Sequence, residues 1–127
     1  MEITPCEYGK IAHFKGMGNP NQSHVYERKR KIDWYCCEKD GTVIGSIGLL
    51  TMGKRTVRIR GLFVLPNFRR QGYGAAMIKY AVETAKNKGY ANIMADTSHR
   101  ALFKSLGFVE TSIEYKSFGG TRMVRQL

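Results

Sequence analysis

Apolar and β-branched residues are concentrated in three successive segments near the middle of the chain, each bounded by turn-forming residues, as is typical of β-strands. Two of them, Trp34 to Glu38 and Thr42 to Leu50, flank Lys39-Asp40-Gly41. Because Asp-Gly supplies the positive φ angles of a tight turn, these two segments are predicted to form a hairpin. The third segment, Thr56 to Leu65, is predicted to end at Pro66, which lacks a backbone N–H donor.

The spacing of apolar residues changes after Gly72 from that of a strand to that of a helix. One helical face carries Ala75, Ile78, Ala81, Val82 and Ala85, and the other carries Lys79, Glu83, Lys86 and Asn87. Gly89 is predicted to cap this helix at its C-terminus. Beyond it we expect a strand at Ala91 to Ala95, a short helix at Ser98 to Leu106 ended by Gly107, and a hairpin of Phe108 to Phe118 and Thr121 to Gln126 about Gly119-Gly120.

The N-terminal region gives weaker patterns. It predicts a strand near Glu2 to Pro5, a short helix at Tyr8 to Phe14 and a loop at Lys15 to Ser23, where Gly, Asn and Pro are frequent. The order of all these elements indicates one mixed α/β domain over residues 1–127. A chain of 127 residues is long enough to bury a core without disulfides or metal.

The composition is that of a soluble globular protein, with 43% hydrophobic and 24% charged residues. No apolar run approaches the roughly 20 residues that cross a bilayer, and the first residues lack the basic flank and apolar core of a secretory signal. We therefore expect a cytoplasmic protein without a membrane partner. Cys6, Cys36 and Cys37 form neither a CxxC pair nor an even set, so they are expected to be reduced, and Cys36 and Cys37 to pack inside a strand.

Charge adds an expectation about partners. Lysine and arginine number 21 against 10 acidic residues, which gives a net charge of +11. An anionic partner such as nucleic acid is consistent with this charge, although basic surfaces also serve solubility. The run Arg28-Lys29-Arg30-Lys31 has the same two interpretations, a solvated face or a nucleic-acid contact.

The segment from Leu62 to Ala75 runs from a strand through a basic turn with two glycines directly into a helix. The first turn of a helix presents unpaired N–H groups and a positive dipole end, and glycine lets phosphate approach the backbone, so this turn is predicted to bind an anion. It is not a dinucleotide fingerprint, because Met77 stands where the third glycine belongs. It also lacks the Gly-Lys-Ser/Thr of a nucleotide P-loop.

At these residues the chain resembles the GCN5-related N-acetyltransferase (GNAT) superfamily. The pattern Arg69-x-x-Gly72-x-Gly74 after Val64-Leu65-Pro66 is similar to the hallmark turn of that family. The segment from Ala101 to Phe108, Ala-Leu-Phe-Lys-Ser-Leu-Gly-Phe, is similar to its second signature. The resemblance implies a mostly antiparallel sheet flanked by helices, with splayed central strands at an acyl-CoA site, and acetyl-CoA or another acyl-CoA as co-substrate without a metal.

The resemblance also implies which residues bind the donor. Leu62, Phe63 and Val64 are expected to offer backbone hydrogen bonds to the pantetheine arm, as an added strand would receive. The turn is expected to wrap the pyrophosphate. The complete expected donor set is Leu62, Phe63, Val64, Arg69, Arg70, Gln71, Gly72, Tyr73, Gly74, Ala75, Asp96 and Phe103.

The chain departs from the family pattern where proton transfer is usually performed. Phe103 replaces a tyrosine that can protonate the departing thiolate, Asp96 replaces a frequent asparagine, and Arg58 and Arg60 occupy strand positions that often hold a glutamate base. The substitute candidates for catalysis are His24, Tyr26, Ser98, His99 and Tyr115, although surface or packing roles are commoner for such residues. Positioning and backbone donors can supply much of the acceleration without them.

Strand alternation places Arg58 and Arg60 on the same face as Leu62 and Val64. Because buried unpaired arginine is costly, two interpretations follow. Either the early half of this strand is exposed, or the two side chains line a site for an acidic acceptor.

Three functions are consistent with the sequence. The first is acyl transfer, most simply of acetyl, from acyl-CoA to an amine by direct attack, with the amine unidentified. The second is modification of nucleic acid or an aminoacyl-tRNA, which the charge of +11 favours. The third is a non-catalytic module that binds CoA or nucleic acid, which Phe103 favours. The oligomeric state is left open, and a dimer is compatible with the sequence.

Overall fold

The computed structural model describes residues 1–14, 31–115 and 120–127, and the side chains of these except 112–115. The strands are β1 (Glu2–Cys6), β2 (Ile32–Lys39), β3 (Thr42–Thr51), β4 (Thr56–Val64), β5 (Asn92–Thr97), β6 (Val109–Tyr115) and β7 (Gly120–Gln126). The helices are α2 (Tyr73–Asn87), α3 (Arg100–Ser105) and the 3₁₀ turns η1 (Tyr8–Lys10) and η2 (Pro66–Phe68). The predicted α/β fold is confirmed.

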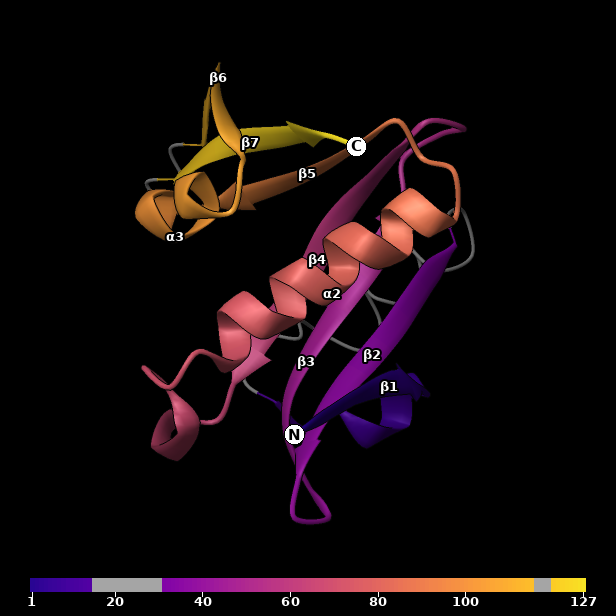
Figure 1. The fold of residues 1–127 in the computed structure, drawn as a ribbon, viewed down its shortest axis with the longest axis vertical. Helices are drawn as coiled ribbons and strands as arrows, with labels where there is room; N and C mark the ends of the chain where they lie inside the picture. The colour runs from indigo at the N-terminus through magenta and orange to yellow at the C-terminus, as the bar shows by residue number, and fades with distance from the viewer. Residues whose placement is uncertain (15–30, 116–119) are drawn as a thin grey trace.

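The strands form one sheet in the order β1-β2-β3-β4-β5-β7-β6. Every neighbouring pair is antiparallel except β4 with β5. The β2–β3 hairpin has positive φ at Asp40 and Gly41, as the Asp-Gly turn predicted. Figure 1 shows α2 lying across one face of the sheet, while β5, β6 and β7 stand apart beside α3.

Helix α2 buries the face that its periodicity predicted. Met77, Ile78, Ala81, Val82 and Ala85 are buried, and they pack against buried residues of β2, β3, β4 and β5 in the main core. Gly72, with φ of 89°, is the N-cap residue directly before the helix, and Gly89, with φ of 87°, follows its end. Both boundaries agree with the sequence prediction, because glycine accepts positive φ without steric cost.

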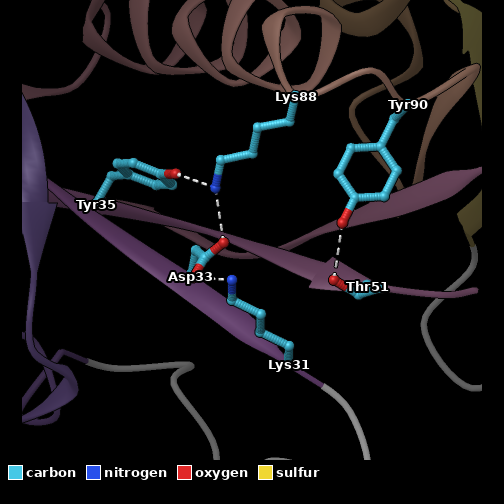
Figure 2. Close-up of polar contacts among 6 residues, drawn as sticks. All are labelled: Lys31, Asp33, Tyr35, Thr51, Lys88 and Tyr90. Atoms are coloured by element: carbon cyan, nitrogen blue, oxygen red, sulfur yellow. Dashed lines mark hydrogen bonds and ion pairs between the residues drawn. The ribbon is translucent and has the colours of Figure 1, made fainter. Parts of the chain in front are cut away.

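The C-terminal end of α2 is fixed to the sheet by a polar cluster (Figure 2). The Lys88 ammonium donates hydrogen bonds to Asp33 Oδ2 at 2.8 Å and to Tyr35 Oη at 3.3 Å. Burial raises the pKa of Tyr35, and the hydrogen bond to Asp33 raises the pKa of Lys88. Nearby, the hydroxyl groups of Tyr90 and Thr51 are hydrogen-bonded at 3.1 Å.

Strand β4 contains a bulge that overturns the predicted alternation. Arg60 pairs with Gly48 of β3, and Phe63 pairs with Ser46. Two residues of β4 therefore lie between these pairs, but only one residue of β3, and Gly61 in the longer segment has φ of 60°. Ser46 Oγ donates a hydrogen bond of 2.8 Å to the Gly61 carbonyl oxygen. The main core consequently contacts Val57 and Ile59 before the bulge, and Leu62 and Val64 after it.

The prediction that Arg58 and Arg60 share a face with Leu62 and Val64 is therefore wrong. The extra residue at the bulge shifts the alternation of inward and outward side chains by one position. Arg58 and Arg60 lie on the face opposite Val57 and Ile59, and both are only partly buried.

The N-terminal prediction is only partly correct. The predicted helix at Tyr8 to Phe14 is a single 3₁₀ turn at Tyr8–Lys10 followed by turns, although Ile11 and Phe14 are buried in a second cluster with Trp34 and Cys36. A segment of seven residues that contains Gly9 is too short to sustain an α-helix alone, so tertiary packing decides the local conformation. The predicted loop at Lys15 to Ser23 lies outside the described residues.

The later elements differ from prediction mainly in length. Strand β5 continues to Thr97, and α3 is shorter than the predicted Ser98 to Leu106. Cys36 and Cys37 are buried, as predicted for packing residues, and all three cysteines are free. In the part of the chain that the structure describes, no helix has the length and apolar content needed to cross a membrane.

Candidate functional site

The turn between β4 and α2 exposes backbone donors at the start of the helix. Gly72 and Arg70 both have positive φ, and no side chain caps the helix. The first bond of the helix joins Ala76 N to the Gly72 carbonyl at 3.0 Å, so the N–H groups of the three preceding helical residues have no partner within the helix. No acidic residue lies in the first turn, which leaves the positive end of the helix dipole uncompensated by a carboxylate.

Two side chains of the turn hold its own backbone. Arg69 Nε donates a hydrogen bond of 2.8 Å to the Val64 carbonyl, and the Arg69 guanidinium lies 5.3 Å from the centroid of the Phe63 ring. Gln71 Nε2 donates to the Asn67 carbonyl at 3.2 Å. The Val64 carbonyl oxygen thus already accepts a hydrogen bond from Arg69.

A cavity of about 620 Å³ opens in front of the helix start. It is lined by Phe68, His99 and Leu102 together with nine of the twelve residues predicted to bind a donor: Leu62, Phe63, Val64, Arg69, Arg70, Gly72, Tyr73, Gly74 and Ala75. We call it the turn cavity. Gln71, Asp96 and Phe103 do not line it.

The turn cavity lies where β4 and β5 diverge. Their parallel pairing covers Thr56 to Arg58 opposite Asn92 to Met94 and then stops. Beyond this point β4 continues to Val64 and β5 to Thr97, and the two strands separate, as Figure 1 shows. The edge of β4 that faces away from β3 is therefore not paired with a strand at Leu62 to Val64 among the described residues.

A second, smaller pocket of about 300 Å³ lies in the same divergence. Its walls include Phe103, and its polar lining comes from Arg58, Arg60, Asp96, Thr97, Ser98 and His99. We call it the arginine pocket. It shares Leu62 and His99 with the turn cavity, so the two spaces meet at these side chains.

The arginine pocket contains a buried carboxylate between two guanidinium groups. The Asp96 side chain is only 4% exposed, and its Oδ2 lies 2.8 Å from Arg58 Nη2. Arg122 approaches from β7 and donates from Nε to Oδ1 at 2.9 Å and from Nη2 to Oδ2 at 3.3 Å. Asp96 thus anchors two arginines, and this pairing offsets the cost of burying its charge.

The sequence pattern does not indicate the pairing of Arg122 with Asp96. Asp96 and Arg122 are opposite each other in the β5–β7 register. That register joins strands separated by a helix and another strand, so no local turn signal could have indicated the pair.

Phe103 is a packing residue on the wall of the arginine pocket. Its side chain is 2% exposed, and its ring meets that of Phe108 edge-on with centroids 5.0 Å apart. It has no group that could donate a proton to a leaving thiolate.

The five candidates for proton transfer differ in whether the structure describes their side chains beside the site. His99 is exposed at the junction of the two pockets, and Ser98 is exposed at the arginine pocket alone. The backbone N–H of His99 donates to Thr97 Oγ1 at 2.9 Å. Tyr115 ends β6, in the part of that strand where only the backbone is described. His24 and Tyr26 lie outside the described residues, so His99 and Ser98 alone of the five are seen beside the site.

Two further basic residues, Lys54 and Arg55, are exposed at the turn before β4. The first three residues of the basic run, 28–30, lie outside the described residues. Within the described ranges, no group of three or more His, Cys, Asp or Glu side chains is arranged to hold a metal ion.

Comparison with known proteins agrees with this architecture. Human N-acetyltransferase 8 is 28% identical over 115 residues, which cover 83% of this chain and 50% of that protein. The chain thus spans about half the length of this curated relative.

Solved structures share the fold at low sequence identity. An acetyltransferase of Bacillus subtilis in complex with CoA has a TM-score of 0.82 and 21% identity, with 98% of this chain and 97% of that chain covered. A GNAT family acetyltransferase from Elizabethkingia anophelis with acetyl-CoA bound has a TM-score of 0.81 and 19% identity, with 99% and 97% covered. The model of the acetyltransferase (GNAT) family matches residues 4–108, so the chain belongs to this family.

Proposed function

We propose that this protein transfers an acyl group, most simply acetyl, from acyl-CoA to an amine by direct attack. The amine nitrogen attacks the thioester carbonyl carbon, the carbon–sulfur bond breaks, and the sulfur leaves with its electron pair as CoA thiolate. The nitrogen loses one proton and the thiolate gains one, so an amide and free CoA are the products.

The observation that carries this proposal is the uncapped start of α2 facing the turn cavity. Its free N–H groups and positive dipole end suit a pyrophosphate, and Gly72 leaves the backbone accessible because no atom lies within 4 Å of the position of an added Cβ. The adjacent edge of β4 at Leu62 and Phe63 suits an extended amide-containing chain such as pantetheine. The two solved neighbours that hold CoA or acetyl-CoA support the same assignment.

The chemistry must proceed without the tyrosine and glutamate of many relatives. We assign proton transfer to His99, because imidazole is the side chain most often used for this purpose and His99 lies where the two pockets meet. Most of the acceleration is then expected from holding the amine against the thioester in the divergence of β4 and β5.

A thiol-release assay tests the proposal. Purified protein is incubated with acetyl-CoA and a panel of amines, and CoA thiol is measured against a sample without amine. We expect amine-dependent release, together with an increase of 42 Da in the mass of one acceptor. Acetyl-CoA that raises the melting temperature without any release in a panel of small amines, peptides, DNA and RNA would identify a non-catalytic binding module instead.

A further inference from the structure

We propose that the arginine pocket binds a small amine that carries a carboxylate group, and that Arg58 and Arg60 recognise this carboxylate. The inference rests on the proposed acyl transfer and specifies its acceptor. It follows from the charge, the fixed geometry and the position of the pocket.

The lining of the pocket is positively charged. Among the described residues, Asp96 is its only acidic side chain, whereas Arg58 and Arg60 both line it. The negative charge of Asp96 is shared by Arg58 and by Arg122. Arginine side chains outnumber acidic ones here, because Asp96 pairs with both Arg58 and Arg122, and Arg60 lines the same pocket. A cationic acceptor would be repelled here, and an anionic one attracted.

The guanidinium of Arg58 is held in place before any ligand arrives. Its contact with Asp96 is made through Nη2, and a guanidinium has five N–H donors in a fixed planar fork. Asp96 is itself held by two bonds from Arg122 on the neighbouring strand. Such a fixed fork is suited to a planar carboxylate, because little side-chain entropy is lost when the bond forms.

The size and position of the pocket favour a small acceptor. A volume of about 300 Å³ is at the lower end of the range of ligand pockets. The apolar walls of Ile59, Ala95 and Phe103 leave room for a hydrocarbon portion between the charged groups. Because His99 and Leu62 also line the turn cavity, an acceptor anchored by its carboxylate would place its amine toward the donor.

Matched acceptors test the inference. Thiol release from acetyl-CoA is measured with the common amino acids and with the carboxamide of each, which differ in the carboxylate alone. We expect at least one free acid to exceed its amide by about 10- to 100-fold in kcat/KM, the factor that a charged hydrogen bond supplies. Arg60→Gln should reduce this ratio toward one, and Arg60→Lys should restore part of it. Lys79→Gln, which removes an equal charge from an exposed position on α2, should leave the ratio unchanged.

A binding measurement separates this inference from the proposed activity. With CoA present, N-acetyl amino acids should raise the melting temperature of the wild type more than their amides do, and Arg60→Gln should abolish the difference. If no amine releases thiol but this binding difference is seen, the proposed acyl transfer is refuted, whereas the proposed carboxylate site is supported. Equal turnover and equal binding of acids and amides would overturn the inference, as would faster acetylation of polyamines, DNA or RNA than of any amino acid.

Discussion

Replacing Gly72 by valine tests whether the turn before α2 binds the donor, because its cost to the backbone can be matched by a control variant elsewhere in the chain. Gly72 has φ of 89°, and no atom lies within 4 Å of an added Cβ. An added Cβ there meets no steric clash, but the residue must adopt the left-handed conformation, at a cost of roughly 1–2 kcal/mol. For a domain of this size we expect the melting temperature to fall by roughly 3–12 °C.

Gly89 supplies a matched control at the opposite end of α2. It has φ of 87°, and again no atom lies within 4 Å of an added Cβ. Gly89→Val should therefore destabilise the fold by about the same amount as Gly72→Val, within roughly 1 kcal/mol. Gly89 does not line the turn cavity, so any difference in ligand response between the two variants reports on the turn.

The assay is thermal unfolding with and without acetyl-CoA. A ligand at about 100 times its Kd stabilises the native state by about 2.7 kcal/mol, which corresponds to roughly 10 °C here. Wild type and Gly89→Val should both show this increase. Gly72→Val should lose it, since the valine side chain occupies the approach to the helix N–H groups. An equal increase in all three proteins would refute the assignment of the donor to this turn.

Three other predictions follow from separate parts of the structure. Phe103→Tyr should leave the fold nearly unchanged and raise turnover, since general acid catalysis contributes about 10²- to 10⁴-fold when the geometry is right; a tenfold loss would show that an apolar wall is needed there. Lys88→Met should cost roughly 0.5 kcal/mol at neutral pH, because its ion pair is partly exposed. The hydrogen bond to Asp33 raises the pKa of Lys88, so the stability difference between wild type and variant should be fully present below the ordinary lysine pKa of 10.5. It should vanish as the pH rises through the raised pKa of Lys88 in the folded protein, and urea unfolding at neutral and strongly alkaline pH measures it. If nucleic acid is the acceptor, the affinity of the protein for duplex DNA should fall with salt concentration at a log–log slope of about −0.9 per phosphate contact. The double variant Lys54→Glu with Arg55→Glu should reduce this slope. Absence of binding at low salt would exclude this acceptor.

Elements with a local backbone signal could be predicted from the sequence. The β2–β3 hairpin follows from Asp40-Gly41, and both ends of α2 follow from glycines at positive φ. The turn before α2, to which we assign donor binding, belongs to this class because local sequence places its backbone groups. The short region at Tyr8 lacks such a signal, and its conformation depends on contacts with residues distant in the chain.

The faces of β4 could not be predicted by counting alternate residues. An isolated glycine inside a strand is a known signal for a bulge, and Gly61 is such a residue, but its exact effect depends on pairing with β3. The role of Asp96 depends on its partners on β4 and β7, which are distant in the chain. The family pattern at Asp96 therefore gives no indication of the ion-pair cluster that shapes the arginine pocket.

The short pairing between β4 and β5 affects how the two parts of the sheet are coupled. Backbone bonds join them only over the first part of β4, and the Arg58–Asp96 ion pair lies where the pairing ends. On the α2 face, by contrast, Ile93 of β5 and Val57 of β4 belong to one continuous apolar core. Cooperative unfolding of the sheet therefore depends on side-chain packing beneath the helix more than on the hydrogen-bond ladder. A truncation such as Ile93→Ala would then let β5, β6 and β7 exchange their amide hydrogens as a unit separate from β1 to β4.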